Sequence, residues 1–285
     1  MNGRRLRWLG LMILPLVGAC QAALFGVVNI RSGNVAAITR TYASDPVREL
    51  DIYRPSAVSV PAPVALFFYG GSWRDGSRSE YAFVGQALAA QGVLTVVADY
   101  RKYPPVRFPD FEVDAAKAAR WTIDHVSDLG GDPRRVFIVG HSAGAQIAAL
   151  LGSDEHYLSA EGLKPRDFAG VIGIAGPYDF LPLTDPKLIE VFGDKSQWPA
   201  SQPINFVDGD EPPFLLLQGD GDRVVNPGNS QRMAAKLREA GVGVTYKRYP
   251  DIGHFRILAG LRYTSLAPTL ADIVAFISQP RRGVH

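Results

Sequence analysis

Short apolar runs separated by longer segments of mixed polarity make up most of the chain. Each run is roughly four to eight residues long and rich in Val, Ile, Leu or Phe, which is typical of buried strands. We expect strands at 63–69, 93–99, 136–141, 169–175, 213–218 and 244–249, with an antiparallel start near 36–55. The mixed segments predict helices at 79–91, 110–129, 143–152, 227–240 and 264–278. This alternation favours an α/β fold whose mostly parallel sheet has helices on both faces.

The length and composition of the chain suit one domain. The chain has 285 residues, of which 47% are hydrophobic, which is enough for a large single core. We assign this domain to residues 36–280. The segment 179–210 breaks the alternation and is predicted to be irregular, because four prolines interrupt it.

Residues 140–144 read G-H-S-A-G and fit the pattern G-x-S-x-G. An apolar run at 136–139 precedes them and helix-forming residues at 145–151 follow, so the serine stands at a strand-to-helix turn. Free N–H groups at the head of that helix favour negative charge that develops there. A Gly-Ser turn that only connects two elements is the alternative, but this context favours a nucleophilic Ser142.

A serine hydroxyl needs a base to take its proton and an acid to hold the base in the right tautomer. In chain order the acid and then the histidine follow the serine. Of the five histidines, His254 fits this order, because it lies in a loop after the predicted strand 244–249. The other four lie before or inside the serine motif, close behind it, or at the chain terminus. An ordinary surface histidine is the alternative interpretation of His254.

Two aspartates, Asp220 and Asp222, follow the predicted strand 213–218. We favour Asp222 as the acid because it lies further from the strand, where a side chain can turn toward the active face. Asp220 is expected to hydrogen-bond its own turn. The Asp-Gly-Asp sequence also suggests a calcium loop, but Val225 and Gln231 stand where an EF-hand needs Gly and Glu. We therefore expect no metal and no cofactor.

A second glycine-containing loop follows the apolar run 63–68. Residues 69–73 read Y-G-G-S-W, and paired glycines let backbone N–H groups approach a ligand closely. A tetrahedral intermediate needs such donors around its oxyanion. The loop lies one strand–helix–strand unit before the serine motif, which favours this role over a simple Gly-Gly turn.

Together these segments resemble α/β-hydrolases of the bacterial esterase type, which include kynurenine formamidases, hormone-sensitive-lipase-like esterases and isoprenylcysteine methylesterases. Residues 69–73 are similar to the H-G-G-x-W loop of these enzymes, with Tyr69 in place of the usual His. Further similar segments are D-Y-R at 99–101, G-G-D-P at 130–133, the acid motif at 219–225 and G-H at 253–254. The resemblance runs from about residue 48 to about residue 276.

The resemblance implies an α/β-hydrolase fold and an acyl-enzyme mechanism. The implied triad is Ser142, Asp222 and His254. The implied oxyanion-hole donors are the N–H groups of Gly71, Ser72 and Ala143. A substrate lid is implied at 179–210, and the candidate substrate contacts are Trp73, Tyr178 and Phe180. Local packing of these aromatic side chains is the alternative, and Tyr69 leaves the subfamily and its substrate open.

The first twenty residues have the pattern of an export signal, with three arginines before an apolar core at 9–17. Residues 16–20 read L-V-G-A-C and resemble a bacterial lipoprotein box, which predicts lipidation of Cys20 and a tether at 21–35. An uncleaved anchor over 8–28 is the alternative, since a membrane span needs about 20 apolar residues. In either case we expect a membrane-anchored protein that faces the periplasm or the cell exterior.

The formal charge and the motifs restrict the function further. Residues 1–20 carry three arginines, so their removal changes the formal net charge from +2 to −1 and gives no reason to expect nucleic-acid binding. The leading hypothesis is a serine carboxylic ester hydrolase acting on a small or medium ester. A formamidase-type amide hydrolase would use the same residues. A surface-anchored binding protein on a non-catalytic hydrolase scaffold is the third hypothesis, against which an intact triad argues.

Overall fold

A computed structural model describes Gly26, Asn29, residues 36–56 and residues 61–279. The predicted signal at 1–20, with the lipidation site Cys20, and most of the tether at 21–35 lie outside the described residues, so these assignments stay predictions. Among the helices that the described ranges contain, none is long and apolar enough to cross a membrane.

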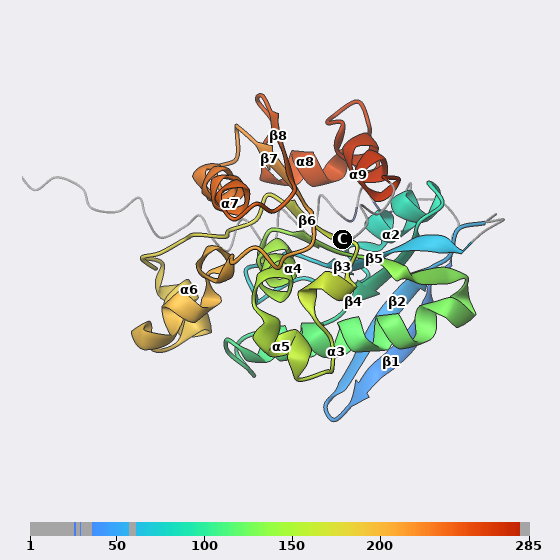
Figure 1. The fold of residues 1–285 in the computed structure, drawn as a ribbon, viewed down its shortest axis with the longest axis horizontal. Coiled ribbons are helices and arrows are strands. Elements are labelled where there is room, and N and C mark those ends of the chain that lie inside the picture. Colours follow the sequence, from blue (N-terminus) through green and yellow to red (C-terminus); the bar gives the residue numbers. More distant parts are fainter. Residues whose placement is uncertain (1–25, 27–28, 30–35, 57–60, 280–285) are drawn as a thin grey trace, which may run out of the picture.

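Eight strands of the described chain form one sheet in the order β1-β2-β4-β3-β5-β6-β7-β8 (Figure 1). Their bounds are β1 Ile38–Ser44, β2 Val47–Tyr53, β3 Ala62–Phe68, β4 Leu94–Ala98, β5 Gly131–His141, β6 Gly170–Ile174, β7 Phe214–Gly219 and β8 Val244–Tyr249. Strand β2 pairs antiparallel with β1 and β4, and the remaining neighbours pair parallel. The predicted α/β fold with a mostly parallel sheet is confirmed.

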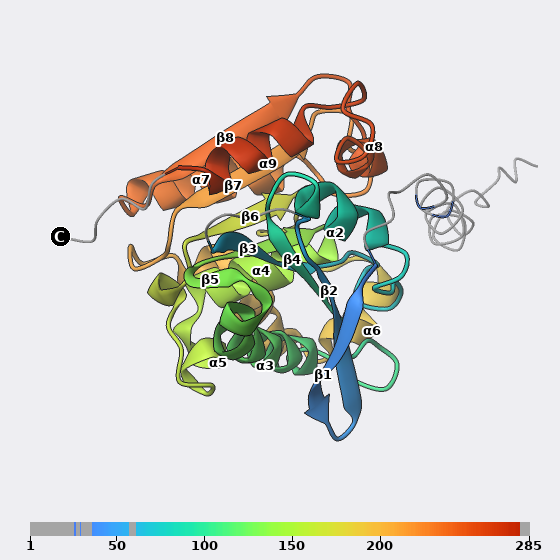
Figure 2. The ribbon, with the colours of Figure 1, turned by 90° about the vertical axis from the view of Figure 1, so that its right-hand side faces the viewer.

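The helices lie on both faces of this sheet (Figures 1 and 2). Their bounds are α2 Ala82–Ala89, α3 Asp110–His125, α4 Ala143–Ser153, α5 Glu155–Ser159, α6 Pro186–Phe192, α7 Gly228–Glu239, α8 His254–Ala259 and α9 Thr269–Ile277. Helix α2 packs against α9 on one face, whereas α3 and α4 pack together on the other. Parallel strands that are covered in this way are buried on both sides.

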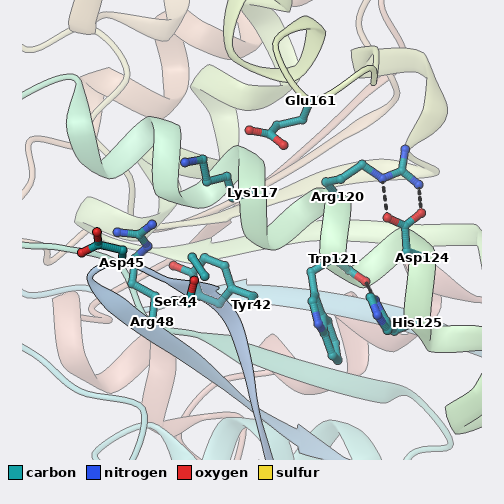
Figure 3. Close-up of a pocket in the computed structure, with 11 residues that line it drawn as sticks. Tyr42, Ser44, Asp45, Arg48, Lys117, Arg120, Trp121, Asp124, His125 and Glu161 are labelled. Atoms are coloured by element: carbon teal, nitrogen blue, oxygen red, sulfur yellow. Dashed lines mark hydrogen bonds and ion pairs between the residues drawn. The ribbon is translucent and has the colours of Figure 1, made fainter.

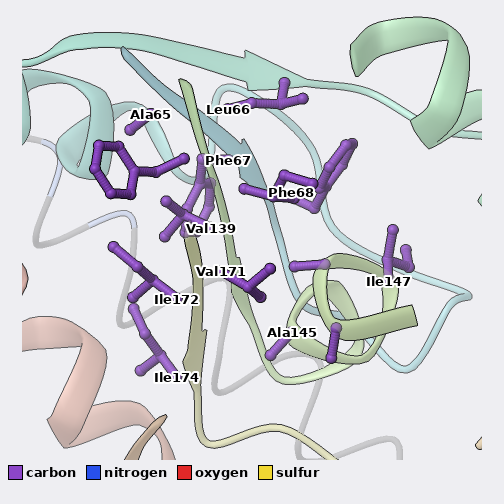
Figure 4. Close-up of a cluster of buried hydrophobic side chains, with 14 of the residues drawn as sticks. Ala65, Leu66, Phe67, Phe68, Val139, Ala145, Ile147, Val171, Ile172 and Ile174 are labelled. Atoms are coloured by element: carbon purple, nitrogen blue, oxygen red, sulfur yellow. The ribbon is translucent and has the colours of Figure 1, made fainter. Parts of the chain in front are cut away.

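The core lies between the sheet and its two helical layers. Every residue of β4 and β6 is buried, as their continuous apolar runs predicted. Consecutive residues of a strand point to opposite faces, so Val171 points toward α4 and its residues Ala145 and Ile147, whereas Ile172 points away (Figure 4). Burial of such apolar surface contributes roughly 25 cal/mol per Å² and dominates the stability of the fold.

Several helix boundaries differ from those predicted. The segment 179–210 was predicted to be irregular, but it contains α6 and two 3₁₀ helices, Lys195–Ser201 and Pro203–Phe206. Short helical turns form there because the side chains of Asp185 and Asp194 accept hydrogen bonds from the first N–H groups of two of these helices. The single helix expected at 264–278 is shorter, and α8 precedes it.

Asn29, from the predicted tether, binds the beginning of α2. Its side-chain Nδ2 donates to the carbonyl oxygens of Ser79 at 3.1 Å and Glu80 at 2.9 Å, and its Oδ1 accepts from the N–H of Phe83 at 3.0 Å. The residue that directly precedes α2, Tyr81, makes no side-chain cap. Asn29 therefore caps this helix from a position 54 residues away in sequence.

We expect Asn29→Ala to lower the free energy of unfolding by about 1 kcal/mol, because loss of a helix cap typically costs this much. Urea denaturation followed by circular dichroism measures the change. Gln91→Ala, at an exposed position just beyond the other end of α2, is the matched control and should have little effect. Equal stability of Asn29→Ala and the wild type would show that the cap contributes nothing.

Candidate active site

Ser142 stands between the last residue of β5 and the first residue of α4, as predicted for residues 140–144. Its backbone has φ 55° and ψ −122°, outside the regions that L-residues favour. A Cβ on Gly140 would lie 2.0 Å from the carbonyl oxygen of Gly144, and one on Gly144 would lie 2.1 Å from that of Phe68. The sharp turn at Ser142 therefore requires glycine at both positions.

His254 links Ser142 to Asp222. Its Nε2 lies 2.9 Å from Ser142 Oγ, and its Nδ1 lies 2.8 Å from Asp222 Oδ2. All three residues are buried. When Nδ1–H donates to the carboxylate, Nε2 is left free to accept the proton of the Ser142 hydroxyl. The structure thus brings the three predicted triad residues into one hydrogen-bonded chain.

The carboxylate of Asp222 accepts hydrogen bonds at both of its oxygens. Oδ1 accepts from the N–H groups of Val224 at 2.8 Å and Val225 at 2.9 Å, and Oδ2 accepts from Gln218 Nε2 at 3.1 Å as well as from His254. Burial alone would raise the pKa of Asp222, but the hydrogen bond and charge of His254 and these N–H groups outweigh it and lower the pKa. Asp222 is therefore ionised at neutral pH.

Asp220 lies apart from the hydrogen-bonded chain of Ser142, His254 and Asp222. Its Oδ1 accepts a hydrogen bond from Arg248 Nε at 2.8 Å, and its N–H donates to the carbonyl oxygen of Tyr249 at 3.0 Å. The expected bond to its own turn is therefore replaced by an ion pair with strand β8. Of the two candidate acids, only Asp222 reaches His254.

The glycine loop after β3 lies against the serine turn. A Cβ on Gly70 would lie 2.9 Å from Ser142 Cβ, so the loop and the serine are in contact. Gly71, Ser72 and Trp73 have φ values of 138°, 54° and 56°, all in the region that favours glycine. Two successive non-glycine residues in this region must be held there by their surroundings.

The three N–H groups predicted as oxyanion donors belong to Gly71, Ser72 and Ala143. Within the part of the chain that the structure describes, none of them donates to a protein acceptor. Ala143 is the first residue of α4, where N–H groups have no partner inside the helix. These groups are therefore available to a ligand next to Ser142.

Tyr69, which stands where similar esterases have His, contributes to packing. Its fully buried ring stacks on Tyr81 at 5.5 Å and on Tyr100 at 4.8 Å between ring centroids. Its hydroxyl donates to Asp99 and accepts from Lys102 Nζ at 2.8 Å. The side chain therefore ties the glycine loop to the segment that follows β4.

His141, which was not predicted to be the base, contacts His254 in a way that the sequence did not indicate. Its Nε2 lies 3.2 Å from the carbonyl oxygen of His254, and the two ring centroids are 4.8 Å apart. Burial, followed by the charge of His254, lowers the pKa of His141 to about 3, so the ring is neutral and its Nε2–H donates. The only signal in the sequence was its position beside Ser142.

The three candidate substrate contacts are aromatic residues in packed surroundings. Tyr178 is fully buried, and its N–H donates to Asn229 Oδ1 at 3.0 Å. The rings of Trp73 and Phe180 stack with centroids 5.8 Å apart. Local packing, the alternative interpretation, therefore describes all three here, and their contact with substrate stays a prediction.

A groove of about 440 Å³ lies at the far edge of the sheet, between the β1–β2 hairpin and α3 (Figure 3). Arg48, Lys117 and Trp121 are among its lining residues, and none of the predicted site residues lines it. In the described ranges no cluster of three or more His, Cys, Asp and Glu side chains could hold a metal ion.

Comparison with known proteins finds the BD-FAE family, whose profile matches residues 50–237. The chain is 32% identical to Esterase LipC of Mycobacterium tuberculosis over 85% of its own length and 64% of that protein. It is also 32% identical to isoprenylcysteine alpha-carbonyl methylesterase ICME of Arabidopsis thaliana, over 75% of this chain and 55% of that protein. The chain thus spans less than two thirds of the length of these relatives.

Solved structures show the same fold. A hyperthermophilic esterase from the archaeon Pyrobaculum calidifontis superimposes with a TM-score of 0.77, covering 93% of both chains at 20% sequence identity. A truncated carbohydrate esterase from gut microbiota gives a TM-score of 0.75 at 22% identity, covering 87% of this chain and 97% of that one. At these identities the likeness concerns the fold alone.

Proposed function

This chain belongs to the BD-FAE family, and from this premise we propose that it is a serine carboxylic ester hydrolase acting on a small or medium ester. The observation that carries the proposal is the hydrogen-bonded chain from Ser142 Oγ through His254 to Asp222. An esterase among the relatives, LipC, supports the same reaction class.

The geometry supports an acyl-enzyme mechanism. His254 Nε2 takes the proton of Ser142 Oγ as this oxygen attacks the ester carbonyl carbon, and the ionised Asp222 stabilises the imidazolium. The N–H groups of Gly71, Ser72 and Ala143 are available to the oxyanion that forms. His254 then gives its proton to the leaving alcohol. Water, activated by the same histidine, hydrolyses the acyl-enzyme and restores Ser142.

A substrate panel tests this function. We expect the purified full-length protein to hydrolyse p-nitrophenyl esters, and to act much more slowly on N-formyl aromatic amines. If the protein hydrolysed only the formamides, the proposal of an ester hydrolase would be wrong, and an amide hydrolase that uses the same residues would take its place. A folded protein that hydrolyses neither class would instead support a binding protein on a hydrolase scaffold.

Export and a lipid anchor at Cys20 are the second part of the proposal. The support is the sequence pattern of 1–20, in which three arginines precede an apolar run that ends at L-V-G-A-C. Several acyl chains would anchor the protein stably, since each buried CH₂ contributes about 0.8 kcal/mol. We expect mass spectrometry to find a lipidated Cys20 at the N-terminus, and Cys20→Ser to block this processing. A retained Met1 would favour an uncleaved anchor.

A further inference from the structure

The indole of Trp73 is the first member of a buried hydrogen-bonded chain that leads away from the triad. Its Nε1 donates to Gln146 Oε1 at 2.9 Å. Gln146 Nε2 in turn donates to Glu112 Oε1 at 3.0 Å and to the carbonyl oxygen of Ser201 at 3.1 Å. Because an indole N–H only donates and a backbone carbonyl only accepts, the Gln146 amide has one possible orientation.

This hydrogen-bonded chain connects helix α3 with helix α4, which begins next to Ser142. Glu112 lies in the first turn of α3 and Gln146 in the first turn of α4, where the N–H of Gln146 donates to the carbonyl oxygen of Ser142 at 3.2 Å. Glu112 and Gln146 are fully buried. Gln146 is thus bonded to the serine turn through its backbone and to the glycine loop through its side chain.

Trp73 directly follows Ser72 in the glycine loop, and both residues have a positive φ. The indole packs on Phe192, Phe180 and Phe111 with centroids 4.8, 5.8 and 6.2 Å away. These ring contacts hold the plane of the indole, and the hydrogen bond to Gln146 fixes its edge.

We propose that Glu112 is a positioning residue for the glycine loop, acting through Gln146 on Trp73 and so on the direction of the Ser72 N–H. The proposal rests on the proposed function, in which this N–H binds the oxyanion. Glu112 contacts none of the reacting atoms. Its carboxyl oxygen holds one N–H of Gln146, and without that acceptor the amide can rotate away from Trp73.

The protonation of Glu112 supports this role and makes it testable. Burial, with a smaller contribution from the charge of Asp154, raises the pKa of Glu112 to about 8, against the hydrogen bond from Gln146. The charge of Glu112 also acts on Tyr100 and Tyr157, which stay neutral because burial raises their own pKa values. Glu112 is therefore protonated at neutral pH.

Ionisation of Glu112 would strengthen its hydrogen bond with Gln146 but would also leave a buried charge, so we expect the carboxylate to move toward water and disturb the hydrogen-bonded chain. Its Oε2 is buried and has no hydrogen-bond partner among the described residues, so the new charge would be held by one N–H of Gln146 alone. The pKa of Glu112 is raised from 4.5 to about 8 in the folded protein, so its contribution to stability falls as pH rises across that interval. We expect the glycine loop to loosen as pH passes about 8.

Kinetics of two Glu112 variants test the proposal. We expect Glu112→Leu to lower kcat for p-nitrophenyl acetate about tenfold with little change in KM, because an N–H of Gln146 is left unpaired. Glu112→Gln keeps an oxygen acceptor and should recover most of that loss. The wild type should lose activity reversibly above about pH 8, and Glu112→Gln should not. Glu239→Gln, at an exposed position on α7, is the control and should keep the alkaline loss.

The NMR signal of the Trp73 indole N–H is a readout that does not depend on hydrolysis. The chain has only four tryptophans, so Trp73→Phe assigns the signal. We expect its chemical shift to titrate near pH 8 in the wild type and to stay constant in Glu112→Gln. If the proposed function failed, no variant would hydrolyse esters, but this titration would remain. An unchanged alkaline loss of activity in Glu112→Gln, or a Trp73 signal that does not titrate, would overturn the proposal.

Discussion

Replacement of Ser142 by alanine should abolish ester hydrolysis and leave the protein folded. Removal of a triad nucleophile typically lowers turnover by about 10⁶, because the remaining groups cannot form the acyl-enzyme. The substitution removes a single oxygen atom, whose side-chain hydrogen bond is to His254, so the fold should tolerate it. Initial rates with p-nitrophenyl acetate and far-UV circular dichroism measure the two effects.

Ser159→Ala is a suitable control, because Ser159 is exposed at the end of α5 and its hydroxyl bonds only the local carbonyl of His156. This variant should hydrolyse esters at the wild-type rate. A soluble, folded Ser142→Ala protein with substantial hydrolysis would refute the assignment of Ser142 as the nucleophile.

The second large effect is expected at the acid. Asp222→Asn should lower kcat by about 10⁴, as loss of tautomer control does in the best-studied triad. The groups around both carboxylate oxygens of Asp222 are N–H donors. In either orientation of an asparagine side chain, its NH₂ group would therefore face another donor and form no hydrogen bond there. His254 would then have to turn an accepting Nδ1 toward it and a donating Nε2 toward Ser142.

Asp220→Asn is the matched control, two residues away in the same loop. Its partner, Arg248, is exposed, and an exposed ion pair contributes about 0–1 kcal/mol, so activity and stability should change little. Steady-state kinetics at equal thermal stability compare the two variants. A greater loss of kcat in Asp220→Asn would reverse the roles of the two aspartates.

Much of the fold was predictable because buried parallel strands have a simple sequence pattern. The runs at β4, β6 and β7 are mostly apolar, with Thr95 and Gln218 as polar exceptions, and the structure buries every one of their residues. The beginning of β5 was not predictable, because Gly131 pairs with Ala62 and the pairing with β3 resumes at Val136, after residues that have no apolar pattern. His254 was predicted in a loop, but it is the first residue of α8. The residue before it, Gly253, has no side chain that could cap the helix, so no signal in the sequence indicated a helix start.

The candidate triad was predictable because its chain order and loop positions carry the information. The residues that support the site and its surroundings were not predictable, because they act through contacts between segments that are distant in sequence. Glu112 and Gln146 are 34 residues apart and face each other only after α3 and α4 pack together. Asn29 and the helix that it caps are more than 50 residues apart. A single sequence gives no periodic signal for such pairs.

The hydrogen bonds of Asp222 determine how many protons can move during the reaction. An ionised carboxylate has about four lone-pair positions. Two N–H groups occupy Oδ1, and the donors from Gln218 and His254 occupy Oδ2, so no position is left for an incoming proton. Under the proposed mechanism, the proton taken from Ser142 therefore stays on the imidazole. Each half of the reaction is then a one-proton process, and the aspartate acts as a fixed charge.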